Sequence, residues 1–215
     1  MKEARLDWDR ASRTGVPEAI YCEGKTALQI NSILAEAKAE DRYLFLTRLD
    51  AEKASALDAA IDYHAASETA VLGAVPAMAD LGVAIVAAGT SDAKVAYEAQ
   101  RTLAFSGVSA DLHIDVGVAG LWRLTECAAT LQDKRIVIAC AGFEAALFSV
   151  LAGLIKAPII AVPTSVGFGV GAGGQAALSS ALASCAPGVL TVNIDNGFGA
   201  ACAALKILNA TLGRP

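Results

Sequence analysis

The sequence has few of the residues that build metal centres and disulfide networks. It contains two histidines, and its five cysteines form an odd set without a CxxC pair. Zinc sites and disulfide frameworks need such residues in clusters at short spacings, so neither kind of site is expected. Unpaired cysteines also favour a reducing compartment, and we expect a cytoplasmic protein.

The chain also lacks an excess of positive charge. Its formal net charge is -5 and its pI is about 5.0, and no basic stretch with interleaved aromatic residues occurs. Proteins that bind nucleic acid neutralise phosphates with a basic surface. We therefore expect no nucleic-acid partner.

Charged residues are scarce in the C-terminal part of the chain. Residues 1–80 carry 9 Lys/Arg and 14 Asp/Glu, whereas residues 136–215 carry five charged residues in all. Glycine, proline and single charges nevertheless interrupt every apolar run before the roughly 18 residues that a membrane-spanning helix needs. The charged N-terminus MKEARLDWDR lacks the apolar segment of a secretory signal. We expect neither a membrane span nor export.

The chain after residue 82 does contain a regular alternation of apolar strands and amphipathic helices. The pattern predicts strands at residues 83–89, 110–116, 135–142, 158–163 and 188–194. It predicts helices at residues 91–107, 120–132, 144–155, 175–184 and after 199. Strands that are apolar throughout are typical of a parallel sheet covered by helices on both faces. We predict an α/β protein with a flavodoxin-like, doubly wound parallel sheet.

The first 80 residues are less regular. Residues 27–39 and 51–65 have helical patterns, while residues 43–49 and 20–22 read as strands. Proline and glycine punctuate the pattern between residues 75 and 82. We predict a small N-terminal α/β domain over residues 1–80 and the larger domain over residues 81–215.

Polar residues and glycines follow the predicted strands of the larger domain. Parallel sheets bind ligands at the carboxyl ends of their strands. The turn Gly89-Thr90-Ser91-Asp92 enters a helix, and its N–H and hydroxyl groups suit a phosphate or a ribose. Asp92 equally suits a helix N-cap. The other candidates at this edge are Asp115, Gly117, Ala141, Gly142, Thr164 and Ser165.

Glu144 is the one acidic residue between Lys134 and Ile194. At the start of a predicted helix, its carboxylate would gain from the helix macrodipole without any further role. Its position after a strand equally suits a general acid or base, or a ligand for Mg²⁺. Both interpretations stay open.

A glycine-rich loop and a polar turn complete this edge. The loop from Gly167 to Gly174 allows close approach to a ligand or movement as a lid, but it has no Walker lysine. Asp195 follows the fifth predicted strand. It suits a cap for the last helix or a contact with substrate.

Cys185 is the candidate nucleophile because it lies in a loop at the end of a predicted helix. Cysteine is most often a small buried apolar residue, and we interpret Cys127, Cys140 and Cys202 in that way. A helix C-terminus raises the pKa of a thiol, so Cys185 would need activation by another group, such as a cationic substrate. Both histidines fall in predicted regular structure and are interpreted as structural.

Several blocks together resemble one family. They are GTSD at Gly89, DVGVAGLWRL at Asp115, AGFEAALFS at Ala141, PTSVGFGVGAGG at Pro163, SCAPGVLTVNIDNGFGAA at Ser184 and DRASRTGVPEAIYCEGKT at Asp9. The chain is similar to the LarB family, the pyridinium-3,5-biscarboxylic acid mononucleotide synthases of nickel-pincer cofactor biosynthesis. Its larger domain resembles the PurE-type aminoimidazole ribonucleotide carboxylases. The sequence departs from the family pattern at Trp122, Ala145, Phe148 and Cys22.

The resemblance implies a carboxylase and hydrolase of nicotinic acid adenine dinucleotide. Such an enzyme adds CO2 to C5 of the pyridinium ring and cleaves the phosphoanhydride, with Mg²⁺ as the expected metal and no organic cofactor. Cys185 would form a covalent adduct with the ring, and Glu144 would transfer the proton or hold the metal. The turn at Gly89 would bind ribose and phosphate. Arg10, Arg13 and Lys25 would bind the adenylate phosphates or stabilise the N-terminal domain.

Two other functions remain open. A PurE-like aminoimidazole ribonucleotide carboxylase or mutase needs a histidine in its catalytic block, where this chain has AGFEAALFS. A nucleotide-binding subunit without catalysis needs only the turn at Gly89. Independently of the function, the scarcity of charged residues in the last 80 positions predicts that apolar helices of the larger domain pack against other subunits. The resemblance implies a homo-oligomer, an octamer or dimers of the PurE type.

Overall fold

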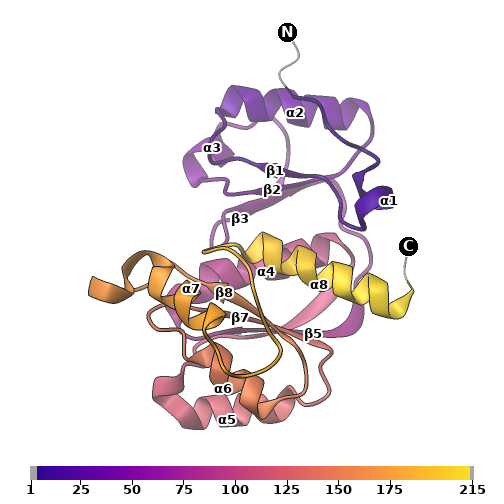
Figure 1. Ribbon diagram of the computed structural model, residues 1–215. Helices are drawn as coiled ribbons and strands as arrows, with labels where there is room; N and C mark the ends of the chain where they lie inside the picture. Colours follow the sequence, from indigo (N-terminus) through magenta and orange to yellow (C-terminus); the bar gives the residue numbers. More distant parts are fainter. Residues whose placement is uncertain (1–3, 214–215) are drawn as a thin grey trace.

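The computed structural model describes residues 4–213 of the chain. Residues 1–3 of the charged N-terminal segment and Arg214 therefore lie outside the described residues. The described chain forms two β-sheets, one above the other in Figure 1. The smaller sheet spans residues 19–72 and the larger sheet residues 79–191, so the larger begins just before the predicted boundary at residue 80.

The smaller sheet is mixed and has four strands. Strand β1 (Ala19–Tyr21) runs parallel to β2 (Leu44–Thr47), and β4 (Thr69–Leu72) and β3 (Asp62–His64) continue the sheet in antiparallel fashion. Helix α2 (Ala27–Ala39) covers its outer face, and Thr26 and Gln29 form a capping box at its start. Helices α1 (Arg10–Thr14) and α3 (Ala51–Ser55) are short.

The helix predicted over residues 51–65 starts as expected but is much shorter than predicted. Helix α3 ends at Ser55, and the chain continues as strand β3. The N–H of Asp58 donates to the side chain of Asn31 on α2, 3.0 Å away, which draws the chain away from the helix axis. Tyr63 then pairs with Ala70 of β4, a long-range contact that local helical periodicity does not contain.

The larger sheet confirms the doubly wound prediction. Its strands are β5 (Ala79–Ala87), β6 (Val108–His113), β7 (Ile136–Ala141), β8 (Ile159–Pro163) and β9 (Val189–Thr191). They are all parallel and lie in the order β6-β5-β7-β8-β9, which is the 2-1-3-4-5 order of flavodoxin-like folds. The order reverses between β5 and β7, where such folds bind ligands.

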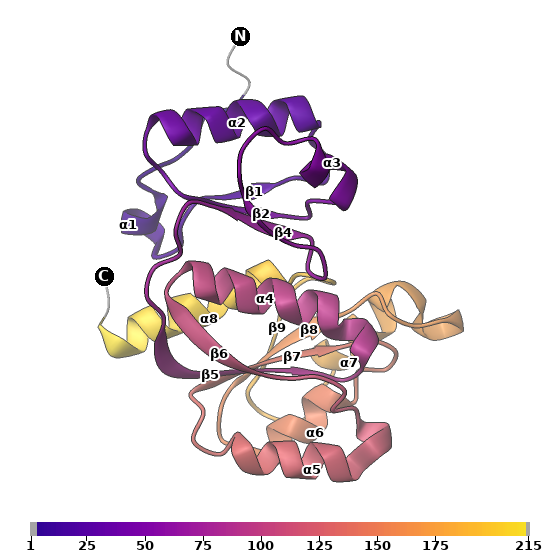
Figure 2. The same cartoon turned by 180° about the vertical axis from the view of Figure 1, so that it is seen from behind.

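Helices cover both faces of this sheet. Helices α4 (Ala93–Phe105) and α8 (Gly197–Leu212) lie between the two sheets, and α5 (Leu121–Thr130) and α6 (Leu147–Leu154) lie on the far face (Figures 1 and 2). Helix α7 (Gln175–Leu182) contributes to the same far-side core as α5 and α6. No helix among residues 4–213 is long and apolar enough to cross a membrane.

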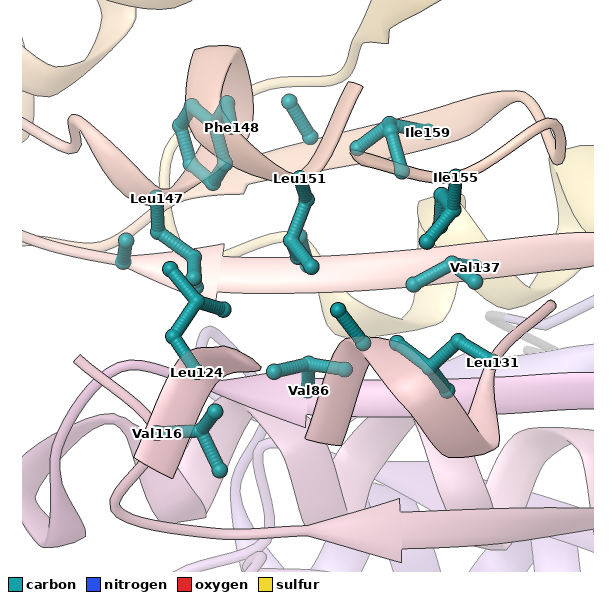
Figure 3. Close-up of a cluster of buried hydrophobic side chains, with 14 of the residues drawn as sticks. Val86, Val116, Leu124, Leu131, Val137, Leu147, Phe148, Leu151, Ile155 and Ile159 are labelled. Atoms are coloured by element: carbon teal, nitrogen blue, oxygen red, sulfur yellow. The ribbon is translucent and has the colours of Figure 1, made fainter. Parts of the chain in front are cut away.

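The far-side core explains why strands β5, β7 and β8 are apolar throughout. Figure 3 shows Val86 and Val137 of the sheet meeting Leu124 and Leu151 of helices α5 and α6. A second cluster fills the other face beneath α4 and α8. Burial on both faces therefore replaces the alternating pattern of a half-exposed strand.

The two sheets are joined by an apolar contact through α4 and α8. Phe45 of β2 lies against Phe105 of α4, with ring centroids 5.4 Å apart, and stacks on Phe198 of α8 at 6.3 Å. Phe45 is fully buried and Phe105 is 3% exposed. The N-terminal sheet thus covers the helices that lead away from the carboxyl edge of the larger sheet.

Ion pairs along α4 reinforce this contact. Lys94 lies 2.7 Å from a carboxylate oxygen of Glu68. Arg101 lies 2.9 Å from a carboxylate oxygen of Asp62 and also donates to its main-chain oxygen at 2.8 Å. Because α4 starts directly after the turn at Gly89, these pairs fix the N-terminal domain beside the carboxyl edge of the sheet.

Candidate active site

Asp92 ties together the loops that follow β5 and β8. It is 3% exposed, and one carboxylate oxygen accepts from the N–H of Gly89 at 2.9 Å. The other oxygen accepts from the hydroxyl of Thr164, the residue after β8. Burial raises the pKa of Asp92, although the hydrogen bonds from Thr164 and Gly89 oppose that shift. Asp92 therefore holds the two loops together, and the burial of its charged carboxylate lowers the stability of the fold.

Glu144 is held in a tight turn and does not lie in a helix. Helix α6 begins at Leu147, so the helix starts three residues later than predicted, and Glu144 precedes its N-terminus. Its neighbours Phe143 and Ala145 have φ of 53° and 50°, in the left-handed region that is strained for residues other than glycine. Two backbone hydrogen bonds hold this turn: the N–H of Ala145 donates to Gly142 at 2.9 Å, and the N–H of Phe143 donates to Val166 in a distant loop at 2.9 Å. The strained turn leaves Glu144 exposed.

Glycines at two of the predicted positions permit close backbone contacts. A Cβ at Gly142 would lie 2.1 Å from the oxygen of Val166. Gly174 has φ of 78°, and a Cβ there would lie 2.8 Å from the oxygen of Thr164. Only glycine fits at either place, so the glycine-rich loop packs against the strand ends. Phe168 of that loop meets Phe143 edge to face at 5.3 Å.

A cleft of about 320 Å³ lies between these loops, at the switch point of the sheet. Seven predicted site residues line it: Gly89, Ser91, Asp92, Gly117, Ala141, Gly142 and Glu144. The rest of the lining is mostly alanine, valine and other apolar side chains. Its only ionisable side chains are the two carboxyl groups of Asp92 and Glu144, and no lysine, arginine or histidine belongs to it. Such a lining suits a flat cation better than an anion.

Asp195 organises the neighbouring loop. It has φ of 54°, its N–H donates to Pro163 at 2.8 Å, and its carboxylate accepts from the N–H of Ser165 at 2.8 Å. Asn196, and not Asp195, caps α8, because its side chain accepts from the N–H of Gly199 at 2.8 Å. The predicted capping role of Asp195 is therefore wrong. Asp195 and Ser165 line a second cavity beside the cleft.

Other predicted site residues do not line either cavity. Thr90 is exposed in the turn after β5, and Thr164 is buried behind Asp92. The side chain of Asp115 forms an ion pair with Arg123 of α5. Gly174 supports the strand ends from outside the cleft.

Cys185 is exposed on the loop between α7 and β9 and is not part of the cleft lining of its own chain. The hydroxyl of its neighbour Ser184 lies 2.7 Å from that of Ser149 on α6, so this loop packs against the helix that follows Glu144. Two large apolar side chains flank the loop and are exposed to 70% at Leu182 and 49% at Leu190.

The remaining cysteines are buried or, at Cys202, partly buried. Burial raises the pKa of Cys127 to about 11, and that of Cys202 to about 12 despite the nearby charge of Lys206. Burial also raises the pKa of Cys140, which is inaccessible within β7, and raises that of Cys22 to about 12. These thiols stay protonated at neutral pH, as expected of structural residues.

The cations suggested for phosphate binding lie elsewhere. Arg13 pairs with Asp7 at 2.6 Å, and Arg10 lies 3.0 Å from Glu18. Arg10, Arg13 and Lys25 line neither the cleft nor the second cavity. The cations that line the second cavity are Arg48 and Lys94. Arg48 directly follows β2. It is the single charged residue within the predicted strand at residues 43–49, and this was the signal that could have found it.

The fit of Mg²⁺ depends on the substrate. Among residues 4–213 no group of three His, Cys, Asp or Glu side chains could hold a metal ion. Magnesium usually keeps several waters and binds through one or two carboxylates together with substrate phosphates. Glu144, which lines the cleft, and Asp195, which lines the neighbouring cavity, are carboxylates that fit that arrangement.

Comparison with known proteins covers nearly the whole chain. Residues 1–75 match the family model described as the LarB/PurE-like N-terminal domain, and residues 82–213 match the AIR carboxylase model. The chain is also 37% identical over 214 residues to an uncharacterized protein of Methanocaldococcus jannaschii. That similarity covers 91% of this chain and 80% of the archaeal protein.

Proposed function

Because the chain belongs to the LarB family and carries a carboxylase domain related to AIR carboxylase, we propose that it acts on nicotinic acid adenine dinucleotide. In this reaction CO2 is added at C5 of the pyridinium ring and the phosphoanhydride is hydrolysed to release AMP. The observation that carries the proposal is the lining of the cleft, which combines apolar side chains with Asp92 and Glu144 and includes no basic side chain. The ring of nicotinic acid is flat with apolar faces, and its nitrogen is cationic while its 3-carboxylate is anionic. The apolar side chains match its faces, and the two carboxyl groups match its cationic part.

The first step of the proposed reaction is the addition of a cysteine thiolate to the pyridinium ring. The thiolate of Cys185 adds to C4 of the pyridinium ring, and the electron pair of the ring moves to N1, which gives a neutral dihydropyridine. Its C5 is now an enamine carbon and attacks CO2 to form a carbon–carbon bond. A base then removes the C5 proton, the C4–S bond breaks, and the thiolate leaves as the ring regains aromaticity. The cationic ring also stabilises the approaching thiolate, which supplies the activation that a loop cysteine lacks.

Glu144 is the base in this proposal. Its exposed carboxylate lines the cleft and stands in a turn that two left-handed residues hold in place. A fixed carboxylate beside the ring accepts the C5 proton as the carboxylated ring regains aromaticity. Bound Mg²⁺ would neutralise charge on the pyrophosphate and assist the attack of water on the phosphoanhydride.

The related activity on aminoimidazole ribonucleotide has less support. That family uses a histidine in its catalytic block, but neither histidine of this chain lines the cleft. His64 lies on β3 and contacts Ser67 at 2.8 Å, and His113 lies on β6. Both histidines therefore lie outside the cleft in which proton transfer would take place.

One assay tests the proposed reaction. The protein is incubated with nicotinic acid adenine dinucleotide, labelled bicarbonate and Mg²⁺, and AMP and the dicarboxylated mononucleotide are measured by liquid chromatography and mass spectrometry. Cys185→Ala should abolish incorporation of label, whereas Cys202→Ala, a change at a partly buried thiol of α8, should retain it. Absence of turnover by the wild type, or full turnover by Cys185→Ala, would sink the mechanism. Label entering aminoimidazole ribonucleotide instead would identify the alternative activity.

Cys185 can reach a cleft only if a second copy of the chain supplies that cleft. It does not line the cleft of its own chain, it is exposed, and exposed Leu182 and Leu190 flank its loop. We propose a homo-oligomer in which this apolar surface packs on a neighbouring subunit and presents Cys185 to the neighbour's cleft.

Mixed oligomers test this arrangement. Glu144→Gln and Cys185→Ala should each be inactive, but co-expressed subunits should recover about a quarter of wild-type activity, because a shared site draws each residue from a different copy. No recovery would place both residues in one chain. A monomer in light scattering at micromolar concentration would contradict the oligomer itself.

A further inference from the structure

Glu98 is a buried carboxylate that the proposed reaction does not use. It lies in the middle of α4 and is 4% exposed. Among residues 4–213, Glu98 and Asp92 are the only acidic residues that are buried. An acidic side chain is almost never buried unless it is paired, because a carboxylate loses its hydration inside a protein. The partners of Glu98 therefore show what its burial achieves.

These partners come from both domains. The hydroxyl of Thr47, at the end of β2, donates to Oε1 of Glu98. The N–H of Phe198, in the first turn of α8, donates to Oε2 at 3.1 Å, and Nε of Arg48 lies 3.6 Å from Oε1. One side chain of α4 thus joins the end of a strand in the N-terminal domain to the start of the last helix.

A glycine at the start of α8 allows this helix to approach Glu98. A Cβ at Gly197 would lie 2.3 Å from the main-chain oxygen of Val95 and 2.9 Å from Oε2 of Glu98. Any side chain at this position would push α8 away from α4. The absence of a side chain therefore brings the N–H of Phe198 within reach of the buried carboxylate.

Arg48 continues the connection from Glu98 to the carboxyl edge of the larger sheet. Nε of its guanidinium faces Glu98, and a terminal nitrogen donates to the main-chain oxygen of Asp195. Arg48 and Asp195 both have a left-handed backbone, with φ of 56° and 54°. Such strain persists only where surrounding contacts enforce it. The hydrogen bond between these residues therefore joins two strained turns from different domains.

This network holds the segment from Asp195 to Phe198 at both ends. Arg48 holds the main-chain oxygen of Asp195, and Glu98 holds the N–H of Phe198. The carboxylate of Asp195 in turn accepts from the N–H of Ser165 at 2.8 Å, and both residues line the cavity beside the cleft. A shift of Glu98 should therefore reach Ser165 through Arg48 and Asp195.

We propose that Glu98 is a positioning residue, which orients Arg48 and the start of α8 and so keeps the turn at Asp195 in the conformation that the reaction needs. Glu98 does not line the cleft, so it acts on the ring only through these partners. Its effect on the rate rests on the proposed function, whereas its effect on the turn does not.

Hydrogen exchange at single amides tests the connection without any turnover. Glu98→Gln keeps the size of the side chain, and its amide can still accept from Phe198 and donate to the hydroxyl of Thr47. The variant loses the charge that orients Arg48. In the substrate-free, full-length protein, exchange at the N–H of Ser165 should become about tenfold faster, as measured by mass spectrometry with fragmentation to single residues. Amides of the far-side helices α5 and α6 should keep their wild-type rates.

A double-mutant cycle tests whether the effect passes through Arg48. Arg48→Lys keeps the charge but loses the planar fork that spans Glu98 and Asp195. It should accelerate exchange at Ser165 to a similar degree. The double variant Arg48→Lys/Glu98→Gln should add little more, because both changes break the same connection. Glu126→Gln, at an exposed glutamate of α5, should leave exchange at Ser165 unchanged.

The kinetics of the proposed reaction provide the second measurement. Glu98→Gln retains every side chain that lines the cleft, so KM for the dinucleotide should stay within about threefold of wild type. The value of kcat should fall about tenfold to a hundredfold, because a small displacement of groups at the site slows the chemistry more than it weakens binding. Glu126→Gln should keep both constants within about twofold.

Three results would overturn the positioning role of Glu98. They are wild-type exchange at Ser165 in Glu98→Gln, equal acceleration of exchange throughout the protein, and fully additive effects in the cycle. Faster exchange at Ser165 with an unchanged kcat would refute a role in the reaction. A wild type without turnover would refute the proposed reaction, and the exchange rates would still decide whether Glu98 holds the turn at Asp195.

Discussion

The two edges of the larger sheet each carry a cavity, and the larger one is at the less promising edge. The amino edge has a hollow of about 460 Å³ lined by Asp80, Leu81, Gly82, Thr130, Asp133, Lys134, Arg135 and Leu212. The cleft at the carboxyl edge is smaller, about 320 Å³. Size alone therefore does not locate the site.

The edges differ in how firmly their residues are held. At the carboxyl edge, Phe143, Ala145 and Asp195 have positive φ, and buried Asp92 connects two loops. In the hollow at the amino edge, only Gly82 has a positive φ, which costs glycine little. Strain persists where the surrounding structure enforces it, and such residues concentrate at functional sites. Conformational constraint therefore marks the site better than cavity volume does.

The largest effect is expected when one carboxylate at each edge of the sheet is replaced by its amide, because only one edge should hold the active site. Glu144→Gln should lower the rate of ring carboxylation about a hundredfold to ten-thousandfold, the usual contribution of a general base. Asp133→Asn, at the amino edge, should leave the rate within about twofold, because its exposed side chain lies in the other cavity. Initial rates of product formation at saturating dinucleotide measure both variants.

A larger loss of rate in Asp133→Asn than in Glu144→Gln would contradict the placement of the site at the carboxyl edge. If Asp133→Asn slowed the reaction as much as Glu144→Gln, the amino edge would hold the site. A loss in Glu144→Gln that appeared only in KM would assign this carboxylate to binding of the cationic ring, with no role in proton transfer.

The sequence predicted the larger domain well because its signals are local. Apolar runs such as residues 135–142 lie between helices, and burial on both faces accounts for each run. The smaller domain was predicted less well because β3 and β4 depend on pairing between distant residues, such as Tyr63 with Ala70. The residues after the strands followed from topology, since parallel strands end at the same edge.

The sequence could not predict how the site is held together. The left-handed turn around Glu144 depends on contacts with the loop at Val166, which lies 22 positions further along the chain. Arg48 reaches Asp195 across 147 positions, and no local pattern encodes that hydrogen bond. The position of Cys185 away from its own cleft also depends on tertiary packing. Periodicity reports which residues are buried, but it does not report which loops meet.

The smallest effect expected distinguishes a buried carboxylate at the carboxyl edge of the sheet, Asp92, from an exposed one at the amino edge, Asp133. Burial raises the pKa of Asp92 above its value in the unfolded chain, so the folded state binds the proton more tightly. Stability from this group is therefore greatest at low pH and declines as the pH rises from about 3.8 through the pKa of the folded state. At neutral pH the protein bears the full cost of the buried charge.

Asp92→Asn removes that charge and keeps the local hydrogen bonds. The amide oxygen of the variant can accept from the N–H of Gly89, and its amide nitrogen can donate to the hydroxyl of Thr164. We expect the free energy of unfolding at pH 7 to rise by about 1 kcal/mol, the usual scale of a single substitution, while Asp133→Asn changes it by less than about 0.5 kcal/mol. In urea titrations from pH 3.5 to pH 8, the advantage of Asp92→Asn over wild type should grow with pH and then level off. An advantage that shrank as the pH rose would mean that the hydrogen bonds to Gly89 and Thr164 outweigh burial, and that the carboxylate stabilises the carboxyl edge as an anion.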